Sequence, residues 1–224
     1  MTLSFKNIAD EILMVLRNSD ILSISVRGVT TKTDSFTATA GQTIFTLTNT
    51  RVKNVRTITK NSVAIKYLRD YTINFETGVL TLLSGATLND SVSITYDYGA
   101  SDKIYSDMPR DDLTLQSFPR ISIELTSSNT NPLDLGGMSH LSDFLITIYL
   151  WVPANKESAI AGGIGGTQDI RYYLGLIRDA IRTNSKSFYS FNYITPFSTS
   201  PLIKGTNNKI LQMSEDFKIK FVVE

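Results

Sequence analysis

The chain contains no cysteine, one histidine and one tryptophan among its 224 residues. The absence of cysteine excludes disulfide bonds, zinc sites with cysteine ligands and thiol catalysis, and it leaves the redox compartment open. A Ser/His/Asp triad or a histidine-rich metal site would have to rest on His140 alone. Stability must therefore come from packing of the chain and, where it assembles, from contacts with other chains.

The chain also has almost no net charge and no long apolar run. The 22 Lys and Arg against 21 Asp and Glu leave a net charge of +1, which gives no long-range attraction to nucleic acid or to an anionic membrane. The longest strongly apolar run, Phe144–Val152, is far shorter than the ~20 residues of a membrane-spanning helix. The N-terminal residues do not resemble a secretion signal. We expect a soluble protein that is not exported.

The middle of the chain has the pattern of an all-β module. From about Ser35 to Gly99, apolar and polar residues alternate, as they do in strands with one buried and one solvated face. Thr77-Gly78 separates two such runs and marks a hairpin turn in which Gly supplies a positive φ. Small and polar residues at both junctions, such as the TTKTDS connector, suit surface linkers. The sequence predicts an inserted β-sandwich domain over residues 33–100.

The two flanks predict a different architecture. Apolar residues recur at helical spacing from Phe5 to Leu16 and from Ile170 to Ile181. The predicted strands are Ile21–Val29, Phe118–Ser127, Asp143–Pro153, Phe188–Ile194 and Phe217–Val223. We expect the second and third of these to pair. Residues 1–32 and 101–224 then form one domain, and the predicted fold class is α+β: a small, mainly antiparallel sheet flanked by two helices and interrupted by the insert.

Two loops between these elements are long or rich in glycine. The first, Ser127–His140, is a run of turn-forming residues long enough to be functional. The second, Ala161–Thr167, reads AGGIGGT and precedes a helix, where a phosphate-binding loop would lie. It lacks the Gly-Lys-Ser/Thr ending and the dinucleotide spacing. We favour a glycine loop that becomes ordered against a neighbouring chain.

Signs of catalysis are few. His140 has no positioned nucleophile or orienting acid beside it, so a surface or interface position is favoured. The acidic pairs Asp111-Asp112 and Glu215-Asp216 would point apart in a strand, which does not suit general acid–base work, and solvated turns are favoured for them. The sequence predicts no enzyme activity, no cofactor and no metal site.

Two further patterns in the module also favour a structural interpretation. The basic stretch Arg51–Lys60 is short and lacks interleaved aromatic residues, which is more typical of a solvated strand edge than of a nucleic-acid site. The module's tyrosines could line a carbohydrate groove, yet their alternating positions are more typical of a sheet core. These tyrosines are Tyr67, Tyr71, Tyr96 and Tyr98.

The order of elements in the flanks is similar to that of the tail terminator (tail completion) proteins of long-tailed bacteriophages and related viruses. The similarity covers most of residues 1–32 and 101–224. It rests on the N-terminal amphipathic helix and on the segments FPRISIEL, DFLITIYLWV, DIRYYLGLIRDAIRTN and EDFKIKFVV, with the long loop after the first. Separately, the insert's pattern GQT-F-L…DYTIN…G-V-L…D-V-I-Y-Y-G resembles small β-sandwich modules of phage structural proteins. The insert is a departure from a minimal terminator.

This resemblance implies a virion protein at the head-proximal end of the tail, assembled in the host cytoplasm. It implies a homo-oligomer, a hexameric ring that caps the tail tube, ends its polymerisation and meets a neck or connector protein. DNA would pass through the ring without sequence-specific binding, and no membrane is involved. We assign the apolar residues of the two loops to contacts with neighbouring subunits or with the tail tube. These interface candidates are Leu133, Leu135, Met138, Ile160 and Ile164.

The resemblance also leaves alternatives. A neck or head-completion protein or a baseplate component would share the β module. A carbohydrate-binding adhesin would use the insert as its binding module, and an enzyme is the most distant option. Under the ring hypothesis, we expect the insert to lie on the outer rim of the ring. Leu135→Asp or Ile164→Asp should weaken assembly without unfolding the subunit.

Overall fold

The computed structural model describes residues 5–23, 28–99, 103–106, 118–132, 140–154, 165–186, 188–189, 191, 193–204 and 209–223. Strands hold 48% of the structure and helices 18%, so the protein is mostly β and the predicted α+β class is wrong. The chain divides into two compact units. Unit 1 comprises Met1–Val26 and Lys103–Glu224, and unit 2 comprises Arg27–Asp102.

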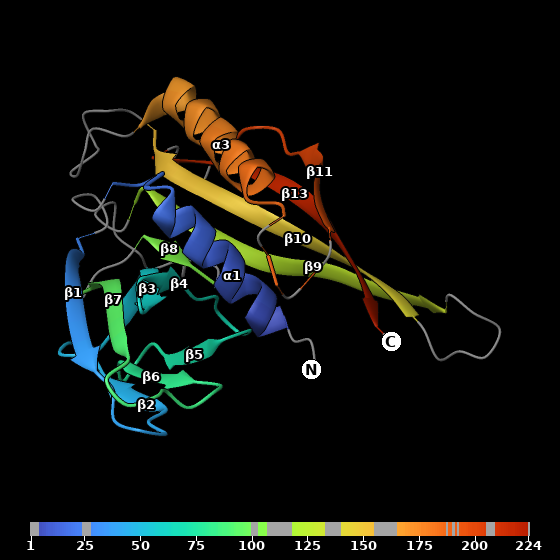
Figure 1. Ribbon diagram of the computed structural model, residues 1–224. Coiled ribbons are helices and arrows are strands. Elements are labelled where there is room, and N and C mark those ends of the chain that lie inside the picture. Colours follow the sequence, from blue (N-terminus) through green and yellow to red (C-terminus); the bar gives the residue numbers. More distant parts are fainter. Residues whose placement is uncertain are drawn as a thin grey trace. The chain divides into compact units, whose positions relative to one another are not determined.

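Unit 1 is built on one six-stranded sheet (Figure 1). Its order is β11-β13-β10-β9-β8, and β12 pairs with β13 beside that path. The strands are β8 (Ile104–Tyr105), β9 (Arg120–Pro132), β10 (His140–Pro153), β11 (Tyr193–Thr199), β12 (Ile203–Lys204) and β13 (Ile210–Val223). The predicted pairing of β9 with β10 is confirmed and is antiparallel. The sheet is nevertheless mixed, because β8 runs parallel to β9.

Two helices cover one face of this sheet, α1 (Phe5–Asn18) and α3 (Gly166–Thr183). Both were predicted from their apolar periodicity, and the apolar residues that define it form part of the core. Ile12 of α1 and Ile177 of α3 are fully buried together with Ile146 and Ile148 of β10. The residues between them in β10, such as Thr147, lie on the opposite face of the sheet. Neither described helix combines the length and the apolar character of a membrane span.

The strands of this sheet extend into a segment that was predicted to be a loop. β9 continues to Pro132 and β10 starts at His140, which pairs with both Pro132 and Val223. The predicted loop Ser127–His140 is therefore wrong for residues 127–132, and residues 133–139 lie outside the described part. Serine, threonine and asparagine favour turns locally, but pairing with a long neighbouring strand outweighs that preference.

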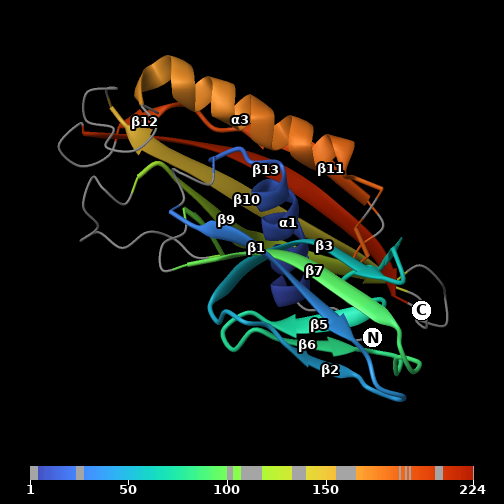
Figure 2. The same ribbon diagram turned by 60° about the vertical axis from the view of Figure 1, so that its left-hand side comes forward.

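Unit 2 consists of two antiparallel sheets, which Figure 2 shows as separate layers. One has the order β1-β7-β3-β4 and the other β2-β6-β5. Their strands are β1 (Thr30–Thr37), β2 (Ile44–Thr46), β3 (Val52–Lys60), β4 (Val63–Ala64), β5 (Tyr71–Asn74), β6 (Val79–Leu82) and β7 (Ser91–Tyr98). The rings of Phe36 in β1 and Phe45 in β2 lie 5.5 Å apart and join the two sheets.

The start of unit 2 differs from the prediction. The polar connector TTKTDS is most of strand β1, which pairs with β7 from Thr30↔Tyr98 to Thr37↔Ser91. Conversely, the predicted strand Ile21–Val29 is absent at Ile21 and Leu22, which are buried outside any strand. The connector was misread because one face of β1 carries only hydroxyl residues, and the other carries Lys32 and Asp34 before Phe36. The apolar alternation that marks a strand is therefore missing.

The predicted hairpin turn at Thr77-Gly78 is confirmed between β5 and β6. Gly78 has φ +70°, a conformation that favours glycine. A Cβ at this position would lie 2.6 Å from the backbone oxygen of Asn49. Both the backbone angle and the close approach of the neighbouring loop therefore require glycine here.

Candidate interaction site

The five interface residues predicted from the sequence cannot be placed. Leu133, Leu135, Met138, Ile160 and Ile164 all lie outside the described residues, so their assignment stays a prediction.

Four large apolar side chains on or before the edge strands β11 and β12 of the unit 1 sheet are exposed. We call this set the edge surface: Tyr189, Tyr193, Phe197 and Ile203, with exposed fractions of 46%, 58%, 67% and 47%. Tyr193 and Phe197 belong to edge strand β11, and Ile203 belongs to β12, which pairs with β13 further along. Exposed aromatic and large aliphatic side chains along a sheet edge are common at protein–protein contact sites.

The backbone beneath the edge surface is held at several points. The backbone N–H of Tyr189 donates to the buried Glu11 carboxylate of α1 at 2.8 Å. At the other end, Ser200 and Ser214 exchange hydrogen bonds, from Ser200 N–H to the Ser214 carbonyl at 2.9 Å and from Ser214 N–H to Ser200 Oγ at 2.8 Å. Between these points β11 pairs with β13. The exposed rings thus project from an ordered backbone, so a partner that binds them need not order the segment first.

Strand β11 is poorly suited to extending the sheet through its own backbone. Pro196 has no N–H to offer, and the pairing with β13 shifts register between Pro196 and Ser198. Prolines and bulges are devices that protect an edge from pairing with another strand. The bulged residue, Phe197, is also the most exposed of the four. The edge surface is therefore built for contact through side chains.

An ion pair with a buried carboxylate and a partly exposed cation lies behind β11 on the helix-covered face. Arg178 of α3 donates from Nε and Nη2 to the two carboxylate oxygens of Glu215 in β13, both at 2.7 Å. Thr199 Oγ1 of β11 donates to the same carboxylate at 2.8 Å. The hydrogen bonds to Glu215 raise the pKa of Arg178 above its ordinary value. The cluster ties α3, β13 and β11 together.

The expectation that Glu215-Asp216 is a solvated turn is wrong, because both residues lie in the middle of β13. As neighbours in a strand they point to opposite faces. On the face away from the helices, Asp216 accepts hydrogen bonds from Thr147 Oγ1 of β10 at 2.8 Å and from Ser198 Oγ of β11. Thr147 in turn bonds Thr126 of β9. This row crosses four strands, so both acids serve the structure of the sheet.

The glycine run before α3 offers no anion site in its described part. Gly165 is the N-cap residue of α3, and its backbone N–H donates to Asp169 Oδ2 at 3.0 Å. This carboxylate occupies the position at the helix start that a bound phosphate would take. Residues 161–164 of the run lie outside the described part.

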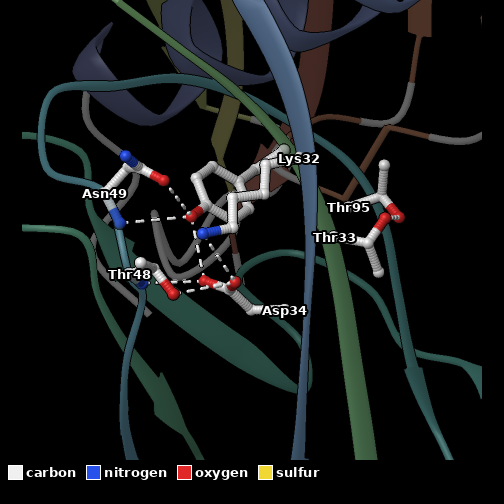
Figure 3. A network of polar contacts seen from close by, with 7 residues as sticks. Lys32, Thr33, Asp34, Thr48, Asn49 and Thr95 are labelled. Atoms are coloured by element: carbon white, nitrogen blue, oxygen red, sulfur yellow. Dashed lines mark hydrogen bonds and ion pairs between the residues drawn. The ribbon is translucent and has the colours of Figure 1, made fainter.

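Polar groups in unit 2 form a network around Asp34, shown in Figure 3. Asp34 of β1 accepts from Thr48 N–H at 2.7 Å, from Thr48 Oγ1 at 2.9 Å and from the Tyr96 hydroxyl of β7 at 2.9 Å. Lys32 Nζ lies 3.7 Å from Asp34 Oδ1. The backbone N–H of Asn49 donates to the Tyr96 hydroxyl at 3.2 Å. The network fixes the loop after β2 against the other sheet.

The electrostatics of this network follow from its hydrogen bonds. Burial by itself raises the pKa of Asp34, but the hydrogen bonds from Thr48 and Tyr96 and the charge of Lys32 outweigh burial, and the pKa lies below 3.8. Burial and the hydrogen bond to Asp34 raise the pKa of Tyr96 to about 12. All these groups satisfy one another, so the network is structural.

Two of the tyrosines and two of the basic residues singled out in unit 2 belong to its core and to its internal ion pairs. Tyr71 and Tyr96 are 3% and 0% exposed, which removes them from any carbohydrate groove. In the basic stretch, Arg56 Nε donates to the buried Asp97 at 2.8 Å and Lys60 pairs with Asp90 at 3.1 Å. These contacts neutralise both cations within the unit, which weakens the case for a nucleic-acid site.

The described residues contain no cluster of three or more His, Asp or Glu side chains that could hold a metal ion. His140 begins β10. The sequence matches no protein-family model and no curated protein.

Sequence reasoning missed the edge surface. The run Tyr193–Ile203 was divided into the end of one strand and a loop, although its aromatic residues beside proline and hydroxyl residues are the signal that could have identified it. Turn-forming residues suggested a loop, whereas residues 193–199 and 203–204 form strands that pair with β13.

Proposed function

We propose that the protein is a virion structural protein that forms a ring, caps the tail tube, ends its polymerisation and joins the tail to the head-side neck. The proposal starts from the similarity of the flanking sequence to tail terminator proteins. The elements on which that similarity rests occur in the expected order within unit 1: α1, β9, β10, α3 and β13.

The observation that carries the proposal is the edge surface. Four large apolar side chains stand in solvent on a backbone anchored by α1 and β13, an arrangement that gains free energy when a partner covers it. Closing a ring requires a heterologous contact, in which two different patches of each subunit meet. The edge surface supplies one patch, and we assign the other to the loops that carry Leu135 and Ile164.

A ring also has two faces that must meet different partners, the tail tube on one side and the neck on the other. A subunit without catalytic chemistry suits that role, since only shape and surface are needed. The structural use of Glu215, Asp216 and the Asp34 network is consistent with such a subunit.

Electron microscopy of the purified full-length chain, alone and with tail tubes, tests the proposal. We expect closed six-fold rings whose lumen matches the tube, and tubes that stop growing when the protein is added. Phe197→Asp should give separate subunits with an unchanged melting temperature. Val63→Asp, at a site in unit 2 that is equally exposed at 67%, is the matched control and should still form rings.

Two results would overturn the proposal. One is a wild-type chain that stays monomeric in the presence of tail tubes and does not affect their length. The other is ring formation that Phe197→Asp and Val63→Asp change equally, because the edge surface would then have no special role in it.

A further inference from the structure

One face of the β1-β7-β3-β4 sheet in unit 2 carries a grid of hydroxyl groups. Its rows follow the strand register: Thr33–Thr95–Thr57 and Ser35–Ser93–Thr59 across β1, β7 and β3, with Thr31–Asp97 and Thr37–Ser91 on either side. The side chains of Thr33 and Thr95 bond each other at 2.9 Å. Figure 3 shows Thr33 and Thr95 on the opposite side of β1 from Lys32 and Asp34. We call this face the hydroxyl face.

Strand β1 is an edge strand of this sheet and borders the hydroxyl face on one side. In the described part of the chain its only strand partner is β7. It is eight residues long, contains no proline, and shows no register shift against β7. An uninterrupted edge strand presents backbone groups that can pair with a further strand. In this respect β1 is the opposite of β11, in which Pro196 and a bulge block pairing.

The side chains of β1 select one partner and one register. In an antiparallel pair of two copies related by a two-fold axis, residues face each other when their numbers add to a constant. With the axis at Thr33 the sum is 66, and Lys32 of each copy faces Asp34 of the other. The same register places Thr31 opposite Ser35, which joins hydroxyl to hydroxyl.

Neighbouring registers are disfavoured by charge. With the axis at Asp34, two buried carboxylates would face each other, and with the axis at Lys32, two ammonium groups would do so. Like charges directly opposite in a sheet destabilise it, and opposite charges stabilise it. Register shifts of a single residue would place the hydroxyl face against Phe36 and Lys32.

We propose that two copies of this chain associate through antiparallel pairing of their β1 strands, with the two-fold axis at Thr33. The two β1-β7-β3-β4 sheets then form one continuous sheet with an unbroken hydroxyl face. Lys32, whose side chain is 37% exposed and whose Nζ lies 3.7 Å from Asp34 of its own chain, gains a second carboxylate. The contact involves unit 2 alone, so it does not rest on the ring proposed for unit 1.

The absence of cysteine makes the register directly testable in the full-length chain. Thr33→Cys introduces the only thiol, and in the proposed pair two copies of it face each other at a Cα separation of about 4.5–5.5 Å, within the range of a disulfide. We expect mild oxidation to convert most of this variant into a covalent dimer on a non-reducing gel. The double variant Lys32→Glu/Thr33→Cys should give a dimer yield at least several-fold lower.

Off-axis positions provide matched controls. Ser35→Cys alone should not form a disulfide, because Ser35 faces Thr31 of the other copy and the two Ser35 positions lie about 13 Å apart along the strands. Mixing Ser35→Cys with Thr31→Cys should yield the cross-linked pair. Repeating the Thr33→Cys experiment in the Phe197→Asp background separates this contact from ring assembly, and the dimer should persist there.

A Thr33→Cys variant that stays monomeric under oxidation at concentrations where the wild-type chain is folded would overturn the proposal. Equal cross-linking of Thr33→Cys and Ser35→Cys would also overturn it, because that result indicates random collision. In either case Lys32 and Asp34 would instead protect the β1 edge from pairing.

Discussion

Arg178 and Glu215 face each other across the packing between α3 and β13, with two parallel hydrogen bonds of 2.7 Å between guanidinium and carboxylate. The side chain of Glu215 is 2% exposed and that of Arg178 is 43% exposed. The pair is therefore closed to water on the carboxylate side and open on the cation side. Thr199 adds a third donor to the carboxylate, so the edge strand β11 depends on the same acid.

Replacing Glu215 should destabilise unit 1. Glu215→Ala removes the acceptor of three hydrogen bonds, and we expect the free energy of unfolding to fall by about 2 kcal/mol. Urea denaturation followed by circular dichroism measures the change. Arg182→Ala is the control, since Arg182 pairs with Asp179 on the exposed side of α3, and it should change stability by less than about 0.5 kcal/mol. Equal losses for the two variants would contradict this account.

Two glycine substitutions should act in opposite directions. Gly78→Ala forces alanine into φ +70° and against the Asn49 carbonyl, and we expect a loss of about 2 kcal/mol. Gly175→Ala lies within α3 and meets no atom within 4 Å, so it should stabilise by about 0.5–1 kcal/mol. Thermal melts of both variants beside the wild type measure the difference. A stabilising Gly78→Ala would show that the turn is not under this constraint.

Alkaline pH should destabilise the chain through Tyr96. Its pKa is raised to about 12 in the folded state from an ordinary value of 10.0, so the hydroxyl stays protonated while the unfolded form ionises. The folded chain then binds more protons, and its stability is complete below pH 10 and declines as the pH rises from 10 toward 12.

Tyr96→Phe isolates this contribution. The variant loses about 1–2 kcal/mol at pH 7 because Asp34 and Asn49 lose a partner, but the difference from the wild type should shrink between pH 10 and 12. Chemical denaturation at several pH values provides the measurement. A constant difference across that range would contradict the raised pKa that burial and the hydrogen bond to Asp34 give Tyr96.

Acidic pH should destabilise the chain through Asp34. The folded pKa lies below 3.8, so the stability contributed by the carboxylate is complete above that value and is lost as the pH falls below it. Asp34→Asn keeps the shape but removes the charge, and it should lower stability at neutral pH and flatten the acid limb of the profile. Arg51→Gln, a change of charge at an exposed position elsewhere in unit 2, should leave the acid limb unchanged.

The helices could be predicted because each one's apolar stripe is complete within its own sequence. The spacing of Ile8, Ile12 and Leu16 predicted α1, and the same residues are fully buried. Strand pairing of β9 with β10 was equally accessible, since Ile121 and Ile123 alternate with polar residues. In these elements the local pattern and the tertiary contacts agree.

The elements that were missed depend on distant partners. Strand β1 is recognisable as a strand only through β7, with more than fifty residues between Thr37 and Ser91. Glu215 is buried because Arg178 lies opposite, 37 residues away in sequence. The edge surface was missed for the same reason, because Phe197 belongs to a strand only through its neighbours' pairing with β13. No local window contains these partners.

The pairing of Thr30 with Tyr98 brings the entry and exit of unit 2 side by side. A Cβ on Gly99 would lie 3.3 Å from the carbonyl oxygen of Gly28, so the chain leaves the unit almost where it entered. The two described ends of unit 2 are consequently only about 5 Å apart, a gap that a tight two-residue turn spans. Unit 2 therefore has the geometry of an exchangeable cassette, because a different module with adjoining ends could be joined at the same two residues.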